Sequence, residues 1–284
     1  MEQLSAEDQQ YVNDLNLTWL ESRYGNFSGS NIISLMAGVD DPELLSKTKV
    51  KLVHKAIETL GKDDLSKVDG SPKIKPLRDV LGWKIPITAE ESKYAYKQLD
   101  PYTEGLKTYA EKVAVESITK FTPDPELTKP WIIRGKELEV PAIERLSIIL
   151  DVDFENVGHD QKFIDHPTIP NYGSTPDAIV RSIDKITVEG KAPNSDTHLK
   201  YRMIKNGADL KEVEPKYFYQ MQSQMDCCQT DKGLFFSFDD RFHDESLHLH
   251  YCYIERDEKV IKQIHQRLEM ANEWIDLFLK KHLK

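Results

Sequence analysis

The pattern of apolar positions along the chain divides it into a helical first part and a mixed second part. Apolar residues recur at helical spacing before residue 40 and again over 92–121, where Ser28 is expected to cap a short helix carrying 32–36. Later in the chain, apolar residues alternate over short segments that are typical of strands: 179–180, 183–188, 234–238 and 247–254. Three further helices are predicted around these segments, over 138–150, 217–225 and 257–282.

This order of elements predicts an α/β (α+β) protein with a mixed central sheet flanked by helices. No linker rich in Pro, Gly or Ser separates the parts, so we expect a single domain over 1–284. Within that domain we expect an extra helical insertion at about 40–130, a core at about 131–256 and a C-terminal helix over 257–284.

Composition narrows the class of protein. The N-terminus is acidic and lacks an apolar stretch, so we expect no secretory signal. No run approaches the roughly eighteen apolar residues of a transmembrane helix, and we expect no membrane association. Three Cys, with Cys227 and Cys228 adjacent, cannot form a disulfide framework or a four-Cys metal site, and they fit a reducing cytoplasm.

Charge is distributed unevenly along the chain. The 38 basic and 48 acidic residues leave a net charge of −10, which disfavours nonspecific coating of nucleic acid. Lys47 to Lys84 nevertheless holds ten basic residues against five acids. This Lys-rich segment is either a solvated helix face or a local track for a polyanion, and its role stays open.

Candidate chemistry lies in Asp177, Glu189 and Lys191. Residues two apart on a strand point to the same face, so Glu189 and Lys191 would project side by side. If Asp177 ends the neighbouring strand, its carboxylate converges on them. Two carboxylates and a backbone carbonyl form the oxygen-rich environment that Mg²⁺ prefers, and a lysine there can orient or help deprotonate a water. The alternative is a surface turn with an exposed ion pair.

Other residues add to this set. Glu139, near the start of a predicted helix, offers a third carboxylate. Gln220 and Gln224 share one helix face that can donate amide hydrogen bonds to phosphate or to the site carboxylates. The alternative for the glutamines is an exposed polar helix. The alternating His248, His250 and Cys252 are better explained by strand burial than by a soft metal site.

Four motifs follow one another in order: Gly-x-x-x-Glu at 135–139, Ser-x-Pro-Asp at 174–177, Glu-x-Lys-x-Pro at 189–193 and Tyr-x-x-Gln-x-Gln-x-x-Met at 217–225. Trp19-x-x-x-Arg23 and Ser28-Gly29-Ser30 precede them, and Tyr253 to Lys259 follows. This order resembles the phage recombination exonucleases of the lambda exonuclease type, in the PD-(D/E)XK nuclease superfamily. The resemblance covers 15–40 and 131–275.

The resemblance implies a restriction-endonuclease-like core and a role for each motif residue. Asp177, Glu189 and the Gly190 carbonyl would hold Mg²⁺, Glu139 would serve a second ion, and Mn²⁺ would substitute. Lys191 would be the catalytic lysine, supported by Gln220. Arg23 and Ser30 would bind the 5′-terminal phosphate, through a planar guanidinium and a hydroxyl near a helix N-terminus. Gly190 replaces the family's usual apolar residue, so we expect a looser or bulged strand there.

The implied activity is processive 5′→3′ digestion of one strand of linear double-stranded DNA, leaving 3′ single-stranded overhangs for recombination by strand annealing. A ring-shaped homotrimer, a single-strand annealing protein as partner and, for a phage-encoded chain, the bacterial host cytoplasm are also implied. Two alternatives stay open: a structure- or site-specific endonuclease on the same core, and a non-catalytic DNA-binding module.

Overall fold

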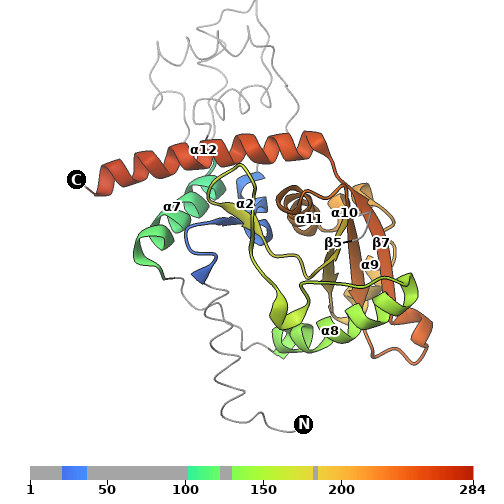
Figure 1. Ribbon diagram of the computed structural model, residues 1–284. Helices are drawn as coiled ribbons and strands as arrows, with labels where there is room; N and C mark the ends of the chain where they lie inside the picture. The colour runs from blue at the N-terminus through green and yellow to red at the C-terminus, as the bar shows by residue number, and fades with distance from the viewer. Residues whose placement is uncertain (1–20, 37–101, 122–129, 182–184, 284) are drawn as a thin grey trace, which may run out of the picture. The chain divides into compact units, whose positions relative to one another are not determined.

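The computed structural model describes residues 21–36, 102–121, 130–181 and 185–283 (Figure 1). The chain divides into two compact units, Met1–Met36 with Thr108–Lys284, and Ala37–Lys107. Nearly all described residues belong to the first unit. The helix expected before Trp19, the Lys-rich segment and most of the predicted insertion lie outside the described residues.

A four-stranded mixed sheet forms the centre of the first unit, as the alternating segments predict. Its strands are β4 (Ala178–Arg181), β5 (Lys185–Lys191), β6 (Lys232–Phe238) and β7 (Leu249–Glu255), in the order β4-β5-β6-β7. The pairs β4–β5 and β6–β7 are antiparallel, whereas β5 and β6 are parallel. The parallel pair requires a long crossover. It consists of α9 (Ser195–Tyr201), α10 (Gly207–Val213) and α11 (Pro215–Cys228).

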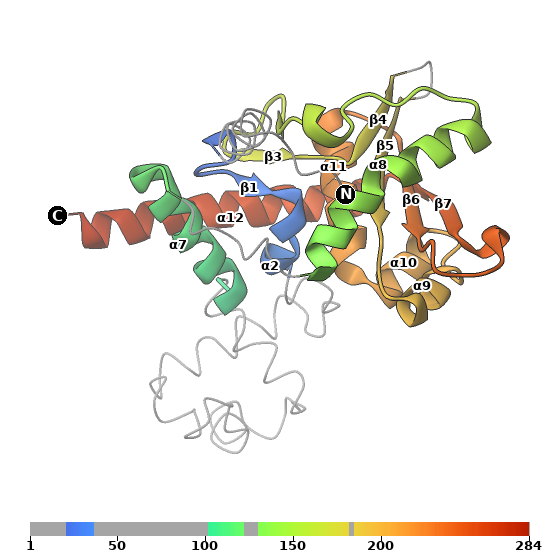
Figure 2. The ribbon, with the colours of Figure 1, turned by 90° about the horizontal axis from the view of Figure 1, so that it is seen from below.

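Helices cover both faces of this sheet. On one face, apolar residues of β5 and β6 such as Val188 and Phe236 pack against Leu146 and its neighbours in α8 (Pro130–Leu150). Figure 2 shows α8 running beside β4 and β5. The intervening residue Glu189 points to the opposite face, where Gln220 of α11 contacts it. The alternation of β5 therefore sends its acidic residue toward α11.

A second, three-stranded sheet joins distant parts of the chain. It consists of β1 (Phe27–Ser28), β3 (Tyr172–Ser174) and β2 (Ile164–Asp165); β1 runs parallel and β2 antiparallel to β3. Strands this short carry no alternation, so the sequence analysis did not predict them. Ser28 ends β1 and precedes the 3-10 helix η1 (Gly29–Asn31) and α2 (Ile33–Met36). Its side chain makes no capping hydrogen bond, contrary to the predicted helix cap.

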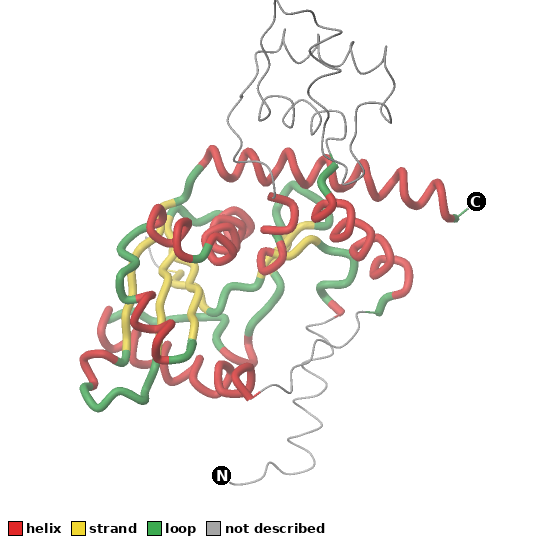
Figure 3. Tube along the Cα trace, turned by 180° about the vertical axis from the view of Figure 1, so that it is seen from behind, coloured by secondary structure: helices red, strands yellow, loops and turns green. Residues whose placement is uncertain are grey.

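The C-terminal helix α12 (Glu258–His282) agrees with the predicted 257–282. Asp257 caps it by accepting hydrogen bonds from the N–H groups of Lys259 and Val260. Figures 1 and 3 show α12 running past α7 (Glu104–Thr119), α2 and α11. Two short 3-10 helices, η2 (Gly158–Asp160) and η3 (Glu245–Leu247), complete the elements. Within the described parts of the chain, no helix is both long and apolar enough to cross a bilayer.

Candidate active site

The motif carboxylates converge where β4 begins beside the end of β5. Glu189 and Lys191 project from one face of β5, and the Lys191 ammonium forms an ion pair with Glu189 Oε1. Asp177 immediately precedes β4, and its Oδ2 accepts a hydrogen bond of 2.7 Å from the N–H of Gly190. The structure thus brings together the three residues that the strand pattern predicted to meet.

Gly190 sits in a regular strand. The pairing of β5 with β6 continues unbroken from Ile186 to Lys191, so the predicted loosening or bulge is wrong. A Cβ at position 190 would collide with the ring of Phe236, which occupies that space. The N–H and C=O of one strand residue point to the same side. The Gly190 carbonyl therefore faces the side on which Asp177 lies.

Two amides of α11 hold the carboxylate of Glu189 in place. Gln220 Nε2 donates to Glu189 Oε1 at 2.7 Å, and Gln224 Nε2 donates to Glu189 Oε2 at 2.5 Å. Glu189 and Gln224 are fully buried and Gln220 nearly so. The predicted hydrogen bonding of the glutamine face to the site carboxylates is confirmed, and the exposed polar helix is excluded.

Glu139 reaches the same site from α8 through a residue that the sequence analysis missed. Gln161 Nε2 donates to Glu139 Oε1 at 2.5 Å and to the Asp177 carbonyl at 3.3 Å. Gln161 therefore connects α8 to the residue that immediately precedes β4. No motif surrounds Gln161, and its partners become neighbours only in the folded chain.

The site contains three carboxylates and one ammonium. Burial raises the pKa of Asp177 well above its usual value, and the nearby Glu189 adds to that increase. Burial also raises the pKa of Glu139, with Lys191 opposing. For Lys191, burial disfavours the charged form, but Glu189 and Asp177 outweigh it and raise the pKa. Lys191 is therefore a stable cation, so it is suited to orienting a water rather than accepting its proton.

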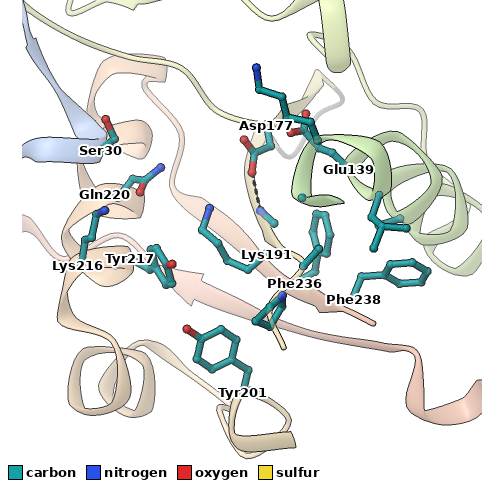
Figure 4. Close-up of a pocket in the computed structure, with 17 residues that line it drawn as sticks. Ser30, Glu139, Asp177, Lys191, Tyr201, Lys216, Tyr217, Gln220, Phe236 and Phe238 are labelled. Carbon is teal, nitrogen blue, oxygen red and sulfur yellow. Dashed lines mark hydrogen bonds between the residues drawn. The ribbon is translucent and has the colours of Figure 1, made fainter. Parts of the chain in front are cut away.

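A cavity of about 460 Å³ opens above these groups. Figure 4 shows Asp177 and Glu139 on one side of Lys191, and Gln220, Tyr217 and Ser30 on the other. The Lys191 ammonium lies 4.8 Å from the centre of the Tyr217 ring, a second contact that the sequence analysis missed. Glu189 lies beneath the cavity and does not line it.

Ser30, one residue of the predicted phosphate-binding pair, lines the same cavity, and Arg23 contacts it. Arg23 Nη2 donates to Ser30 Oγ at 3.3 Å, and Ser30 lines the cavity wall from η1. Burial lowers the pKa of Arg23, whereas Tyr109 and Glu116 favour its charged form. A guanidinium stays protonated at any physiological pH, so the cavity has a hydroxyl, that of Ser30, with a cation directly behind it.

A second cluster of possible metal ligands lies on α11, at Asp226 with His166 and His265. The N–H groups of Thr168 and Ile169 donate to His166 Nδ1 at 3.2 and 2.9 Å, so Nδ1 is the acceptor and Nε2 carries the proton. A protonated nitrogen cannot ligate a metal. Nε2 instead faces Asp226 Oδ2 at 3.4 Å. The cluster therefore has a structural role, in which it connects separate segments of the chain.

The His248, His250 and Cys252 set forms no metal cluster within the described ranges. His250 Nε2 lies 2.7 Å from the Ile204 carbonyl, and His248 Nε2 lies 2.6 Å from the Phe242 carbonyl. These contacts agree with the structural interpretation of the strand.

Comparison with models of protein families assigns the chain to one family. Residues 84–232, more than half of it, match the YqaJ-like viral recombinase domain. The chain belongs to this family. No curated protein sequence matches it.

Solved structures share the fold. The alkaline exonuclease LHK-Exo from Laribacter hongkongensis is 20% identical, with a TM-score of 0.59 over 93% of this chain and 94% of that one. LHK-Exo in complex with dAMP gives a TM-score of 0.58 over 93% and 96%, also at 20% identity. A phage-related exonuclease from Haemophilus somnus 129PT is 15% identical, with a TM-score of 0.50 over 69% and 90%. The predicted resemblance to phage recombination exonucleases and the predicted mixed α/β fold are confirmed.

Proposed function

We propose that this protein is a metal-dependent deoxyribonuclease that digests one strand of linear double-stranded DNA processively from the 5′ end. Its product would be a 3′ single-stranded overhang for recombination by strand annealing. The observation that carries the proposal is the convergence of Glu139, Asp177, Glu189 and Lys191 at a cavity that Ser30, the hydrogen-bond partner of Arg23, also lines. The exonuclease activity in the names of the structural neighbours supports it.

The donor set fits a divalent cation. Three clustered carboxylates are opposed by one ammonium, and the raised pKa values of Asp177 and Glu139 reflect buried negative charge without enough compensation. Asp177, Glu189 and the Gly190 carbonyl would hold one Mg²⁺ and Glu139 would serve a second, with Mn²⁺ as a substitute. The bound ions would supply charge stabilisation at the phosphodiester under attack.

The protein side chains would do the rest. The Lys191 ammonium, held between Glu189 and the face of Tyr217, would orient the attacking water. Gln220 and Gln224 keep Glu189 in one orientation. Arg23 and Ser30 would bind the 5′-terminal phosphate and thereby place the first phosphodiester over the carboxylates.

A closed ring and a protein partner complete the proposal. We expect a homotrimer around DNA, a single-strand annealing protein as partner, and action in the bacterial host cytoplasm for a phage-encoded chain. A sedimentation mass equal to a single chain would contradict the ring.

The decisive experiment offers three substrates with Mg²⁺: linear duplex with 5′-phosphate, the same duplex with 5′-hydroxyl, and supercoiled plasmid. We expect rapid loss of one strand of the phosphorylated linear duplex and an intact plasmid. Plasmid cleavage would favour the endonuclease, and binding without any degradation would favour the non-catalytic module. Lys191→Ala should abolish degradation, whereas Lys200→Ala, an exposed lysine of α9, should not.

Metal binding can be measured without activity. Mn²⁺ should raise the melting temperature of the intact protein, by an amount that grows with ion concentration. The increase should vanish in Asp177→Ala. An equal increase in that variant would place the ion elsewhere.

A further inference from the structure

A buried tyrosine of α7 is connected by hydrogen bonds to the Arg23–Ser30 pair. Tyr109 is only 8% exposed and packs edge-on against Phe27 of β1, with ring centres 5.3 Å apart. Its hydroxyl oxygen accepts a hydrogen bond of 2.7 Å from the Ser28 N–H and lies 3.3 Å from Ser28 Oγ. Ser28 Oγ in turn lies 3.2 Å from Ser30 Oγ.

The position of each hydroxyl hydrogen in the row Tyr109–Ser28–Ser30 can be assigned in turn. The Tyr109 hydroxyl already accepts from a backbone N–H, and the acceptor within reach of its own hydrogen is Ser28 Oγ. Asn31 Nδ2 also donates to Ser28 Oγ, at 3.4 Å, so the Ser28 hydroxyl is left to donate toward Ser30 Oγ. Burial raises the pKa of Tyr109, which keeps its hydroxyl protonated as this order requires.

Ser30 is the last hydroxyl in this row of hydrogen bonds. Its oxygen accepts from Ser28 on one side and from Arg23 Nη2, at 3.3 Å, on the other. The two acceptor positions of the hydroxyl are then occupied, and its hydrogen is directed away from both neighbours. The Ser30 side chain lines the cavity, so that hydrogen is available to a group inside it (Figure 4).

We infer that Tyr109 is a positioning residue that sets the direction of a Tyr109–Ser28–Ser30 hydrogen-bond relay and so makes Ser30 a donor to the 5′-terminal phosphate of DNA. This inference rests on the proposed function and deepens it. Without the Tyr109 hydroxyl, Ser28 Oγ loses the group that donates to it, and the backbone N–H of Ser28 loses the oxygen that accepts from it. Ser28 can then accept from Ser30, which turns the Ser30 hydrogen away from the cavity.

The test measures binding in EDTA, without catalysis, of two duplexes that differ only in a 5′-phosphate or a 5′-hydroxyl. Fluorescence anisotropy gives the ratio of the two affinities. Tyr109→Phe should lower this ratio by about tenfold, the effect of one hydrogen bond to a charged group, and leave binding of the hydroxyl duplex unchanged. Ser28→Ala removes the oxygen that would accept from Ser30, so it should lower the ratio much less than Tyr109→Phe. The double variant should regain most of the preference lost in Tyr109→Phe, because Ser28 Oγ is then absent as a competing acceptor.

Tyr172→Phe is the matched control. Tyr172 is also buried, and its hydroxyl donates to Ser223 Oγ at 2.8 Å, outside the relay. It should leave the ratio unchanged. An equal loss in this control, or a double variant that loses as much as Tyr109→Phe, would overturn the relay.

Failure of the inference and failure of the proposed function give different results. If the intact protein prefers the phosphorylated duplex and Tyr109→Phe keeps that preference, the relay is wrong and the phosphate site stands. If the intact protein shows no preference, the phosphate site and the relay fail together.

Discussion

Helix α11 contributes to two polar clusters whose charges are balanced in opposite ways. Around Glu189, three carboxylates face a single ammonium. Around Asp226, one buried carboxylate faces three donors, because Arg256 Nη2 lies 2.8 Å and His265 Nε2 2.6 Å from its oxygens, with His166 nearby. The first cluster has an excess of negative charge, whereas in the second both oxygens of the carboxylate are satisfied by neighbouring donors.

The difference separates the candidate active site from a cluster with a structural role. A satisfied buried network rigidifies the fold, and here it ties the segment after β2, α11 and α12 together. Asp177 and Glu139, whose pKa values are raised and which line a cavity, cost stability as charged groups, and such a cluster is typical of a site completed by a ligand. The first cluster should therefore matter for activity and the second for folding.

The largest expected effect is loss of activity in Asp177→Asn. Degradation of 5′-phosphorylated duplex should fall on the order of 10³-fold, since the neutral amide removes a charge from the proposed ion site. Stability measured by urea unfolding in EDTA should stay equal or rise, because Asn keeps an acceptor for the Gly190 N–H while the repulsion from Glu139 and Glu189 is relieved.

The stability difference between Asp177→Asn and the intact protein should depend on pH. The folded pKa of Asp177 lies above its unfolded value, so its charge destabilises the fold increasingly as pH rises from about 4. The advantage of Asp177→Asn should thus vanish below about pH 4 and be greatest at neutral pH. A variant that unfolds more readily at neutral pH would contradict the contrast between the clusters.

The second expected effect is loss of stability in Asp226→Asn. Removing the anion leaves the Arg256 cation without its counter-charge, and the one amide oxygen of Asn cannot serve both Arg256 and His265. This change should lower the free energy of unfolding by about 3–5 kcal/mol. Activity per folded molecule at low temperature should be retained. The matched control is Asp231→Asn, an exposed acid, which should change stability by less than about 0.5 kcal/mol.

A smaller effect is expected at the link between α8 and the strands. Gln161→Ala should reduce activity by about 10–100-fold, because Glu139 loses the amide that orients it. Urea unfolding should change little, and Gln266→Ala, an exposed amide of α12, should alter neither property. Full activity in Gln161→Ala would indicate that Glu139 is positioned without it.

The smallest effect concerns His166. Burial lowers its pKa in the folded protein, whereas the unfolded residue gains a proton near pH 6.5. Stability should therefore fall as the pH drops below about 6.5, by at most about 1.4 kcal/mol per pH unit for each such histidine. His198 and His250 have lowered pKa values too, so His166→Gln should reduce this slope only in part. An unchanged slope would mean that the folded protein keeps His166 protonated.

Prediction from the sequence succeeded where the signal was local. The alternation of β5 places Glu189 and Lys191 on one face, and helical spacing places Gln220 and Gln224 on another, so both pairs could be inferred from neighbours in the chain. The short strands β1, β2 and β3 have no such pattern, because each exists only by pairing with a distant segment.

The amino-acid sequence alone determined the order of the main strands and helices and which acidic residues and lysine would form the site, because both depend on periodicity and on motif spacing. Only the tertiary structure decided that Gln161 orients Glu139, that Phe236 fills the space above Gly190, and that Tyr109 contacts Ser28. Those contacts join residues 22, 46 and 81 positions apart. A single side chain that meets its partner across such a separation leaves no periodic trace in the sequence, so packing in three dimensions selects it.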